Sequence, residues 1–203
     1  TYLGASLELS YREIDEEALE DSNWLYIEGY VVTDDQRTAV ASDAMNFAKQ
    51  KGVKTSLSLS DPFVVEVFSD NIKTIIGENG VDLLFCNGDE ARSLTDTHTI
   101  EAAAESLKQY AKTFVITRGP GGSLVYDGKK LIHTPGVLTN AIDTNGAGDM
   151  FAGSFLYALG HGKDFAWAAD FANAASARVV SQFGPRIKVI EYISIKQQFK
   201  IHD

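Results

Sequence analysis

Residues 143–153 bring together the residue types that phosphoryl chemistry needs. They read Asp-Thr-Asn-Gly-Ala-Gly-Asp-Met-Phe-Ala-Gly. Small residues let the backbone approach a ligand closely, and here they open a stretch that predicts a helix. The first amides of a helix are unpaired and carry partial positive charge, so they can hold a phosphoryl group in transfer. Gly146, Ala147 and Gly148 are therefore the predicted anion hole.

Asp149 falls in the first turn of the same predicted helix. From this position its carboxylate can accept the proton of a substrate hydroxyl while the neighbouring amides hold the transferring group. The spacing therefore suits phosphoryl transfer to an alcohol, with Asp149 as the catalytic base. A structural interpretation exists for any Gly-rich turn taken alone, in which the acidic residue caps the helix and the glycines serve tight packing.

Taken whole, residues 143–153 resemble the second signature of the ribokinase family, the PfkB-type carbohydrate and nucleoside kinases. A second stretch, Asn-Gly-Asp-Glu at 87–90, resembles the N-x-x-E motif of that family. The resemblance implies that Asn87 and Glu90 help to organise Mg²⁺ and phosphate, with Glu90 reaching the metal through water. Taken alone, these residues read as a helix cap with an acidic first turn.

The stretch Thr-Arg-Gly-Pro-Gly-Gly at 117–122 resembles the nucleotide loop of the same family. The resemblance implies that Thr117, Gly119 and Gly122 approach ATP. The same glycines also predict a turn into a β-hairpin. Both interpretations fit the residues.

A late Ala-rich helix, predicted at 168–181, matches the family helix in which an asparagine, here Asn173, lies near the adenine. Residues 181–186 look like the loop that closes the nucleotide site, and this places Phe183 and Gly184 there.

In the family, carbonyl groups of that loop and the Asp that opens the second signature, here Asp143, commonly bind a monovalent cation such as K⁺. An Asp at this place can instead fix a turn through its own side chain. Arg118 and Arg186 can meet phosphate or pair with a surface carboxylate, and the sequence leaves both alternatives open.

Strand-like runs alternate with helix-like runs through most of the chain, the pattern of a parallel sheet covered by helices. The clearest predictions are strands at 24–30, 54–60 and 82–86, a helix at 35–51 ended by Gly52, a helical stretch at 63–80 broken at its two glycines, and a hairpin at 123–134. We predict one α/β domain over residues 1–203, a Rossmann-like three-layer parallel sheet flanked by helices. By the resemblance it is the C-terminal portion of the family fold with the nucleotide site, and the N-terminal strands and lid are missing.

Composition excludes several classes of protein. Of the 203 residues 44% are hydrophobic and 23% are charged, as in soluble globular proteins. The net charge of −10 argues against nucleic-acid binding, and no apolar run reaches the roughly 18 residues of a membrane span. The single cysteine, Cys86, excludes an internal disulfide framework and fits a cytoplasmic location.

The resemblance implies a kinase that uses ATP and Mg²⁺ to phosphorylate a hydroxyl of a sugar or nucleoside, closer to the adenosine kinases and ribokinase-like sugar kinases than to phosphofructokinase-type members. A non-catalytic nucleotide-binding or regulatory fragment of that family is the alternative. A dinucleotide oxidoreductase is disfavoured, because its glycine fingerprint should follow the first strand. A sheet without its N-terminal neighbours would expose edges and apolar helix faces. We therefore expect the chain alone to be weakly active, and to pair with a companion N-terminal segment or a second copy.

Overall fold

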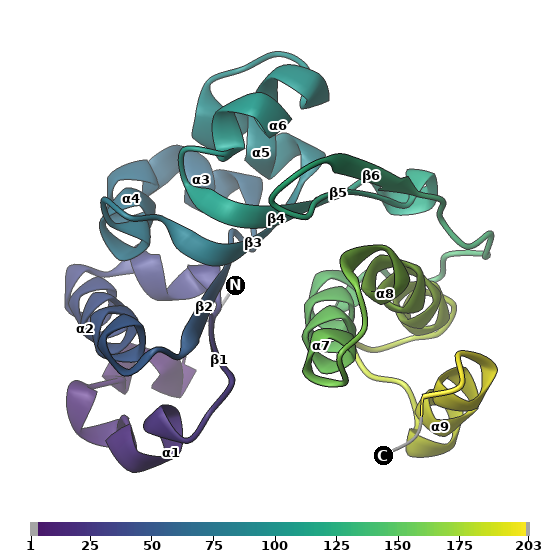
Figure 1. Ribbon diagram of the computed structural model, residues 1–203, viewed down its shortest axis with the longest axis horizontal. Coiled ribbons are helices and arrows are strands. Elements are labelled where there is room, and N and C mark those ends of the chain that lie inside the picture. Colours follow the sequence, from purple (N-terminus) through teal and green to yellow (C-terminus); the bar gives the residue numbers. More distant parts are fainter. Residues whose placement is uncertain (1–3, 202–203) are drawn as a thin grey trace. The chain divides into compact units, whose positions relative to one another are not determined.

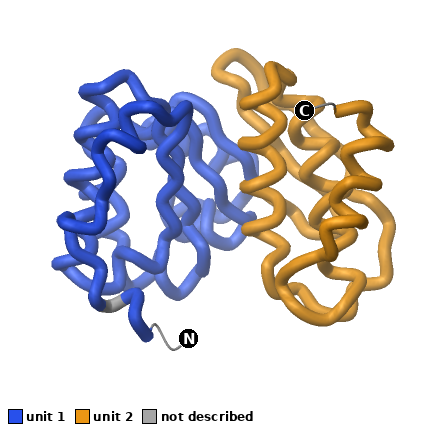
Figure 2. The backbone as a smooth tube through the Cα atoms, turned by 90° about the horizontal axis from the view of Figure 1, so that it is seen from below, with its two compact units in different colours: residues 1–116 blue, residues 117–203 orange. Residues whose placement is uncertain are grey.

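The computed structural model describes residues 4–201 of the chain. The chain divides into two compact units, residues 1–116 and residues 117–203 (Figure 2). This division concerns only which residues pack together, so the single domain expected from the sequence stays a prediction. Within residues 4–201, no helix combines the length and the apolar character that crossing a membrane requires.

Unit 1 is built on four strands in the order β1-β2-β3-β4. The strands are β1 (Trp24–Ile27), β2 (Lys54–Ser58), β3 (Val81–Asn87) and β4 (Ala111–Thr117), whose last residue opens unit 2. β1 pairs with β2 in parallel, and β2 pairs with β3 in parallel, with Ser56 opposite Leu83. The carboxyl ends of β1, β2 and β3 therefore lie at one edge of the sheet, the edge at which open α/β sheets bind ligands.

Helices join these strands, and Figure 1 shows α2, α3, α4 and α5 on one face of the sheet. The helical elements of unit 1 are η1 (Gly4–Glu8), η2 (Tyr11–Glu13), α1 (Glu16–Glu20), η3 (Gly29–Thr33), α2 (Asp35–Lys51), α3 (Pro62–Val67), α4 (Ser69–Ile76), α5 (Gly88–Thr95) and α6 (Ile100–Leu107). The predicted bounds of α2 are confirmed. Asp34 caps its start by accepting from the amide of Arg37, and Gly52 ends it with φ of +76°.

Three predicted elements of unit 1 differ from the structure, and one of them is the strand expected at 54–60, which ends at Ser58. The strand expected to reach residue 30 ends at Ile27, because the chain turns into η3 where Gly29 packs on backbone. A Cβ on Gly29 would lie 2.6 Å from the carbonyl oxygen of Ser58, so only glycine fits there. The helical stretch at 63–80 is two helices, separated at Phe68 as well as ended at Gly77.

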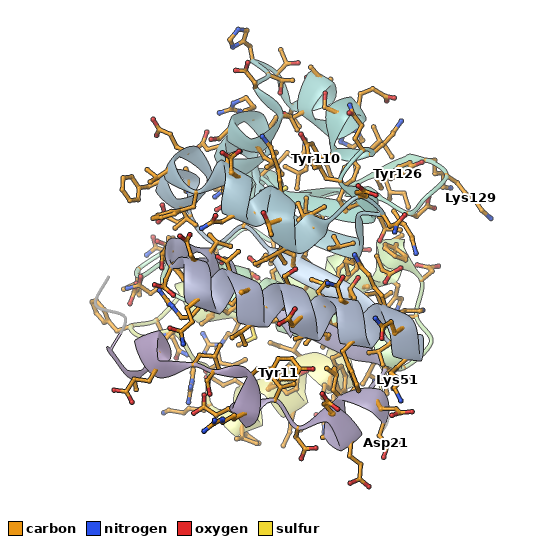
Figure 3. All side chains as sticks on the ribbon, turned by 90° about the vertical axis from the view of Figure 1, so that its left-hand side faces the viewer. Tyr11, Asp21, Lys51, Tyr110, Tyr126 and Lys129 are labelled. Carbon is orange, nitrogen blue, oxygen red and sulfur yellow. The ribbon has the colours of Figure 1, made fainter. Side chains whose placement is uncertain are left out.

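The start of unit 1 is tied to α2. Lys51 Nζ donates to Glu20 Oε2 at 2.6 Å, and Figure 3 shows Lys51 at the same end of α2 as Asp21, the residue after α1. Beneath this pair, Leu19 packs with Ala48 and Val53 in a small buried cluster. The acidic segment before β1 is thereby anchored on α2 through both apolar contact and an ion pair.

Unit 2 combines a hairpin with three helices: β5 (Ser123–Tyr126), β6 (Leu131–Thr134), α7 (Ala147–Gly160), α8 (Phe165–Val180) and α9 (Val189–Gln198), with the short turn η4 (Gly119–Gly121) before β5. The predicted hairpin is confirmed, with Ser123 opposite Thr134. Figure 1 shows α7 beside α8. Phe155 and Phe171 are fully buried, and Tyr192 of α9 contacts the rings of Tyr157 and Phe171. The sequence did not predict α9.

Candidate active site

The turn that opens α7 leaves two amides without partners. Gly146 is the N-cap in the left-handed conformation, and its carbonyl accepts from Met150 at 2.9 Å. The amide of Ala147 donates to the carbonyl of Thr144 at 3.2 Å. For Gly148 and Asp149, no acceptor within residues 4–201 contacts the backbone N–H. A Cβ on Gly148 would meet nothing within 4 Å, so the space beside Gly148 is open.

Asp149 lines a cleft of about 700 Å³ in unit 2. The walls come from the first two turns of α7, the segment after α8, and the start of α9. The lining residues are Asp149, Met150, Gly153, Ser154, Pro185, Arg186, Ile187, Val189 and Tyr192. Asp149 and Arg186 are the charged members of this wall. The carboxylate therefore faces a space that a small molecule can enter, next to two free amides.

The loop at 182–186 is packed directly on the turn before α7. A Cβ on Gly146 would lie 2.5 Å from the carbonyl oxygen of Pro185, and Gly146 has φ of +76°. Both the close approach and the backbone conformation therefore require glycine here. This glycine positions the loop, whereas Gly148 leaves space above the amides.

Asp143 joins the same two segments through its carboxylate. Oδ1 accepts from the amide of Asn145 at 3.0 Å, and Oδ2 accepts from the amide of Gly184 at 2.9 Å. These two backbone hydrogen bonds, the Asn145 bond first, hold the pKa of Asp143 below its usual value. The bonds are those of a turn-fixing aspartate. Binding of a monovalent cation by Asp143 stays a prediction.

Phe183 and Gly184 stand in the middle of this loop. The side chain of Phe183 is 84% exposed, and Gly184 adopts φ of +91°. An exposed aromatic ring on a fixed loop is available to a ligand, although its contact with nucleotide stays a prediction.

The loop after β4 forms a tight turn into β5. Arg118 N–H donates to the carbonyl of Gly122 at 2.8 Å, and Gly122 N–H donates to the carbonyl of Gly119 at 3.0 Å. A Cβ on Gly122 would lie 2.1 Å from the carbonyl oxygen of Thr134, whereas one on Gly119 would meet nothing within 4 Å. Gly122 is therefore needed by the hairpin, and Gly119, two residues after Thr117, presents open backbone.

Asn173 is 7% exposed and lies on the face of α8 that meets the hairpin. Its Nδ2 lies at hydrogen-bond distance from three acceptors: Thr134 Oγ1 at 3.1 Å, the carbonyl of Pro135 at 3.2 Å and Ser123 Oγ at 3.3 Å. The hydroxyls of Ser123 and Thr134 are themselves 2.6 Å apart. The amide nitrogen of Asn173 thus fastens α8 to β5 and β6. Its predicted place near an adenine is left to a test.

Asn87 and Glu90 lie in unit 1, where β3 ends and α5 begins, at the carboxyl edge of the sheet. Asn87 N–H donates to Glu90 Oε2 at 2.8 Å, and Asn87 Nδ2 donates to Glu90 Oε1 at 2.7 Å. Asn87 Oδ1 accepts from the amides of Asp89 and Glu90, which completes a capping box. The motif therefore forms the helix cap that its residues predicted.

Glu90 is also electrostatically unusual. Burial raises its pKa to about 7, and the neighbouring carboxylates of Asp61 and Asp89 add to the rise, while the Asn87 amide opposes it. A buried carboxylate with a raised pKa, at the ligand-binding edge of a sheet, is a candidate for holding a cation. No group of three or more His, Cys, Asp or Glu side chains in residues 4–201 could hold a metal by itself. Glu90 therefore fits a hydrated Mg²⁺ that takes its remaining ligands from elsewhere.

Sequence reasoning missed part of this site. The far wall of the cleft comes from α9, including Val189 and Tyr192, and no motif marked that segment. The partners of Asn173 on the hairpin were missed as well, although Ser123 and Thr134 stand opposite each other in the predicted hairpin and were available as a signal.

Comparison with known proteins places the chain in a family. A model described as "pfkB family carbohydrate kinase" matches residues 1–191. Adenosine kinase of Saccharomyces cerevisiae is 27% identical over 204 residues, which cover 91% of this chain and 58% of that protein. Adenosine kinase from Sinorhizobium meliloti superposes with a TM-score of 0.91 and 30% identity, covering 97% of this chain and 61% of that one. A probable sugar kinase from Rhizobium etli CFN 42 gives 0.92 and 29%, covering 98% and 61%.

These superpositions confirm the predicted ribokinase-like α/β fold. The chain spans about three fifths of the length of these relatives. It belongs to the pfkB family of carbohydrate kinases.

Proposed function

We propose that this chain carries the base and the nucleotide site of a kinase that transfers a phosphoryl group from ATP to a hydroxyl of a sugar or nucleoside. One observation carries the proposal: the carboxylate of Asp149 and the free amides of Gly148 and Asp149 stand together on the first turn of α7, beside an open cleft.

Each group has a role in the transfer. Asp149 accepts the proton of the acceptor hydroxyl as its oxygen attacks. The amides of Gly148 and Asp149 hold the oxygens of the transferring group, where negative charge must be stabilised. Gly146 and Ala147 shape the turn: Gly146 admits the 182–186 loop, and Ala147 closes the turn on Thr144. Catalysis of this kind consists of positioning and charge stabilisation, as phosphoryl transfer generally requires.

The nucleotide would lie against the two loops of unit 2. The open backbone at Gly119 supports a contact from the loop of Thr117 and Gly122, and the exposed ring of Phe183 supports a contact from the loop of Gly184. For Asn173, the hydrogen bonds to the hairpin support a positioning role: Asn173 would hold the adenine side of the site in place. We further propose K⁺ near Asp143, in addition to its turn-fixing bonds.

Mg²⁺, when bound, would neutralise charge on the phosphates. Asn87 and Glu90 are the residues that would hold it, through water. Both oxygens of Glu90 already accept hydrogen bonds from Asn87, and this favours an outer-sphere contact over direct ligation. A buried carboxylate whose pKa is raised to about 7 gains from a nearby cation, because the cation stabilises its charged form.

The acceptor class rests on the relatives, which are named as adenosine kinases and sugar kinases. A panel of nucleosides and sugars, tested with ATP and Mg²⁺ for ADP formation by a protein that also carries the expected N-terminal companion segment, examines the proposal. We expect turnover with a member of one of these two classes, and none with the Asp149→Asn protein. Binding of ATP without turnover of any acceptor would contradict the kinase and favour the non-catalytic nucleotide-binding alternative.

A further inference from the structure

Arg186 is a free cation in the wall of the cleft that Asp149 lines. Its side chain is exposed, and its guanidinium makes no hydrogen bond and no ion pair with any group in residues 4–201. The nearby Arg178 differs, because it pairs with Glu191 and also donates to Ser181 Oγ. The chain has 28 acidic and 18 basic residues, so most arginines have carboxylates available to pair with. An arginine that faces a cleft without such a pair can instead bind an anionic ligand.

The backbone around Arg186 is fixed, although its side chain is free. The Arg186 carbonyl accepts from Gln182 Nε2 at 3.2 Å. The preceding Pro185 packs against Gly146, and Gly184 donates to Asp143. Three contacts therefore tie this loop to itself and to the turn that opens α7. A side chain that starts from so defined a position loses less freedom on binding than one from an untethered loop.

We infer that Arg186 binds the phosphoryl group in transfer, as a cation that complements the free amides of Gly148 and Asp149. The inference rests on the proposed function and adds a residue to it. An arginine presents a planar fork of donors that matches two phosphate oxygens at once. Within residues 4–201 Asp149 makes no ion pair, and a nearby cation would offset its negative charge when an anionic group approaches it.

A phosphate in this cleft could come from two sources, the γ-phosphate of the nucleotide or a phosphate carried by the acceptor. The geometry favours the nucleotide, because the same loop residues that hold Arg186 also hold the turn with the free amides. We therefore assign Arg186 to the γ-phosphate.

The test measures the affinity of the 203-residue chain for MgATP, MgADP and adenosine by titration calorimetry. Three variants are compared with the unchanged protein: Arg186→Gln, Arg186→Lys, and Lys188→Gln as a control that removes the same charge two residues away, outside the cleft wall. A hydrogen bond to a charged group predicts about a tenfold or larger loss of MgATP affinity for Arg186→Gln. MgADP should lose less and adenosine nothing, Arg186→Lys should keep part of the affinity, and Lys188→Gln should resemble the unchanged protein.

Because the guanidinium has no partner within residues 4–201, both Arg186 variants should unfold at the same temperature as the unchanged protein. Unchanged MgATP affinity in Arg186→Gln would overturn the inference. Equal losses of affinity for MgATP and MgADP in Arg186→Gln would place Arg186 on another phosphate of the nucleotide. If Arg186→Gln instead weakened only the competition by ribose 5-phosphate, Arg186 would contact a phosphate on the acceptor. Either result also overturns the assignment. These binding measurements do not depend on turnover, so they are separable from the Asp149→Asn test, which can fail by itself.

Discussion

The backbone amide of Gly184 donates a 2.9 Å hydrogen bond to Oδ2 of Asp143, which stands 41 residues earlier in the chain. The other oxygen of the same carboxylate accepts from Asn145. One side chain therefore holds both the turn that opens α7 and the loop that carries Arg186. Together with the packing of Gly146 against Pro185, this carboxylate links the two segments that carry Asp149 and Arg186.

Asp143→Ala should loosen the 182–186 loop while leaving the hairpin intact. We expect faster hydrogen–deuterium exchange of the Gly184 amide and weaker MgATP binding. Asp127→Ala is the matched control, because Asp127 also accepts two backbone amides, those of Lys129 and Lys130, within the hairpin turn. Unchanged protection of Gly184 in Asp143→Ala would show that other contacts hold the loop.

The same bond has a predictable pH dependence. The backbone hydrogen bonds lower the pKa of Asp143 in the folded chain below the usual 3.8. The stabilisation is therefore present above that value and is lost as pH falls through the lowered pKa. Protection of the Gly184 amide, relative to its intrinsic exchange rate at each pH, should stay constant from neutral pH to about pH 4 and fall only in stronger acid. Loss of protection between pH 6 and pH 5 would contradict this assignment.

Two glycines of the same turn should respond in opposite ways to alanine. Gly146→Ala places a Cβ 2.5 Å from the Pro185 carbonyl oxygen at a φ of +76°, so it should lower the midpoint of thermal unfolding. Gly148→Ala meets no atom within 4 Å inside a helix, so its stability should be equal or higher by up to about 1 kcal/mol. Its methyl group would nevertheless crowd the free amides, and turnover should fall. A Gly146→Ala protein as stable as the unchanged chain would refute the packing argument.

Asn173→Ala should destabilise the protein by about 1–3 kcal/mol, because it removes the Nδ2 donor that lies within hydrogen-bond distance of the buried hydroxyls of Ser123 and Thr134 and of the Pro135 carbonyl. Chemical denaturation measures this change. If Asn173 instead served only as an adenine ligand, stability would be unchanged and nucleotide affinity alone would fall. That outcome would remove the positioning role.

Glu90→Gln should change the pH dependence of stability and damage activity, and it should cost one of the two hydrogen bonds from Asn87 at every pH because an amide nitrogen cannot accept. Burial raises the pKa of Glu90 from an ordinary 4.5 to about 7. Because the folded pKa is the higher one, Glu90 costs no stability below about pH 4.5, costs progressively more between pH 4.5 and pH 7, and has a constant cost above pH 7. The glutamine variant stays neutral, so its stability relative to the unchanged protein should grow across this window by roughly 3 kcal/mol at most. Unfolding at pH 5 and pH 8 measures this difference, and equal values at the two pH values would contradict the raised pKa.

Most helices and strands of the fold could be predicted from local sequence signals such as caps and glycines. The helix at 35–51 has its capping Asp34 and its terminating Gly52 in the sequence, and Asn87 with Glu90 spells out its own capping box. The break at Phe68 and the helix α9 carried no such signals. In α9, Val189, Ile190 and Ile193 are 76%, 68% and 40% exposed, so its apolar residues do not trace one buried face. Tertiary contacts, such as Tyr192 on Phe171, are what place that helix.

The candidate site was likewise predictable where local sequence signals mark it. The composition of residues 143–153 is enough to expect a Gly-rich turn with a carboxylate beside it. The sequence does not show which glycine is required for packing and which leaves space for a ligand. Gly146 and Gly122 pack against backbone atoms of Pro185 and Thr134, which are distant in the chain, whereas a Cβ on Gly148 would meet open space. Such differences depend on which segments the fold brings together, and a single sequence does not record them.

The most direct test of the account compares turnover with MgATP binding in Asp149→Asn. Asp164→Asn is the matched control, since Asp164 caps α8 and asparagine also serves as a cap. We predict that Asp149→Asn loses turnover by about 10²-fold or more while its MgATP affinity stays within a few-fold of the unchanged protein, and that Asp164→Asn keeps both. Turnover retained in Asp149→Asn would contradict the assignment of this carboxylate as the base.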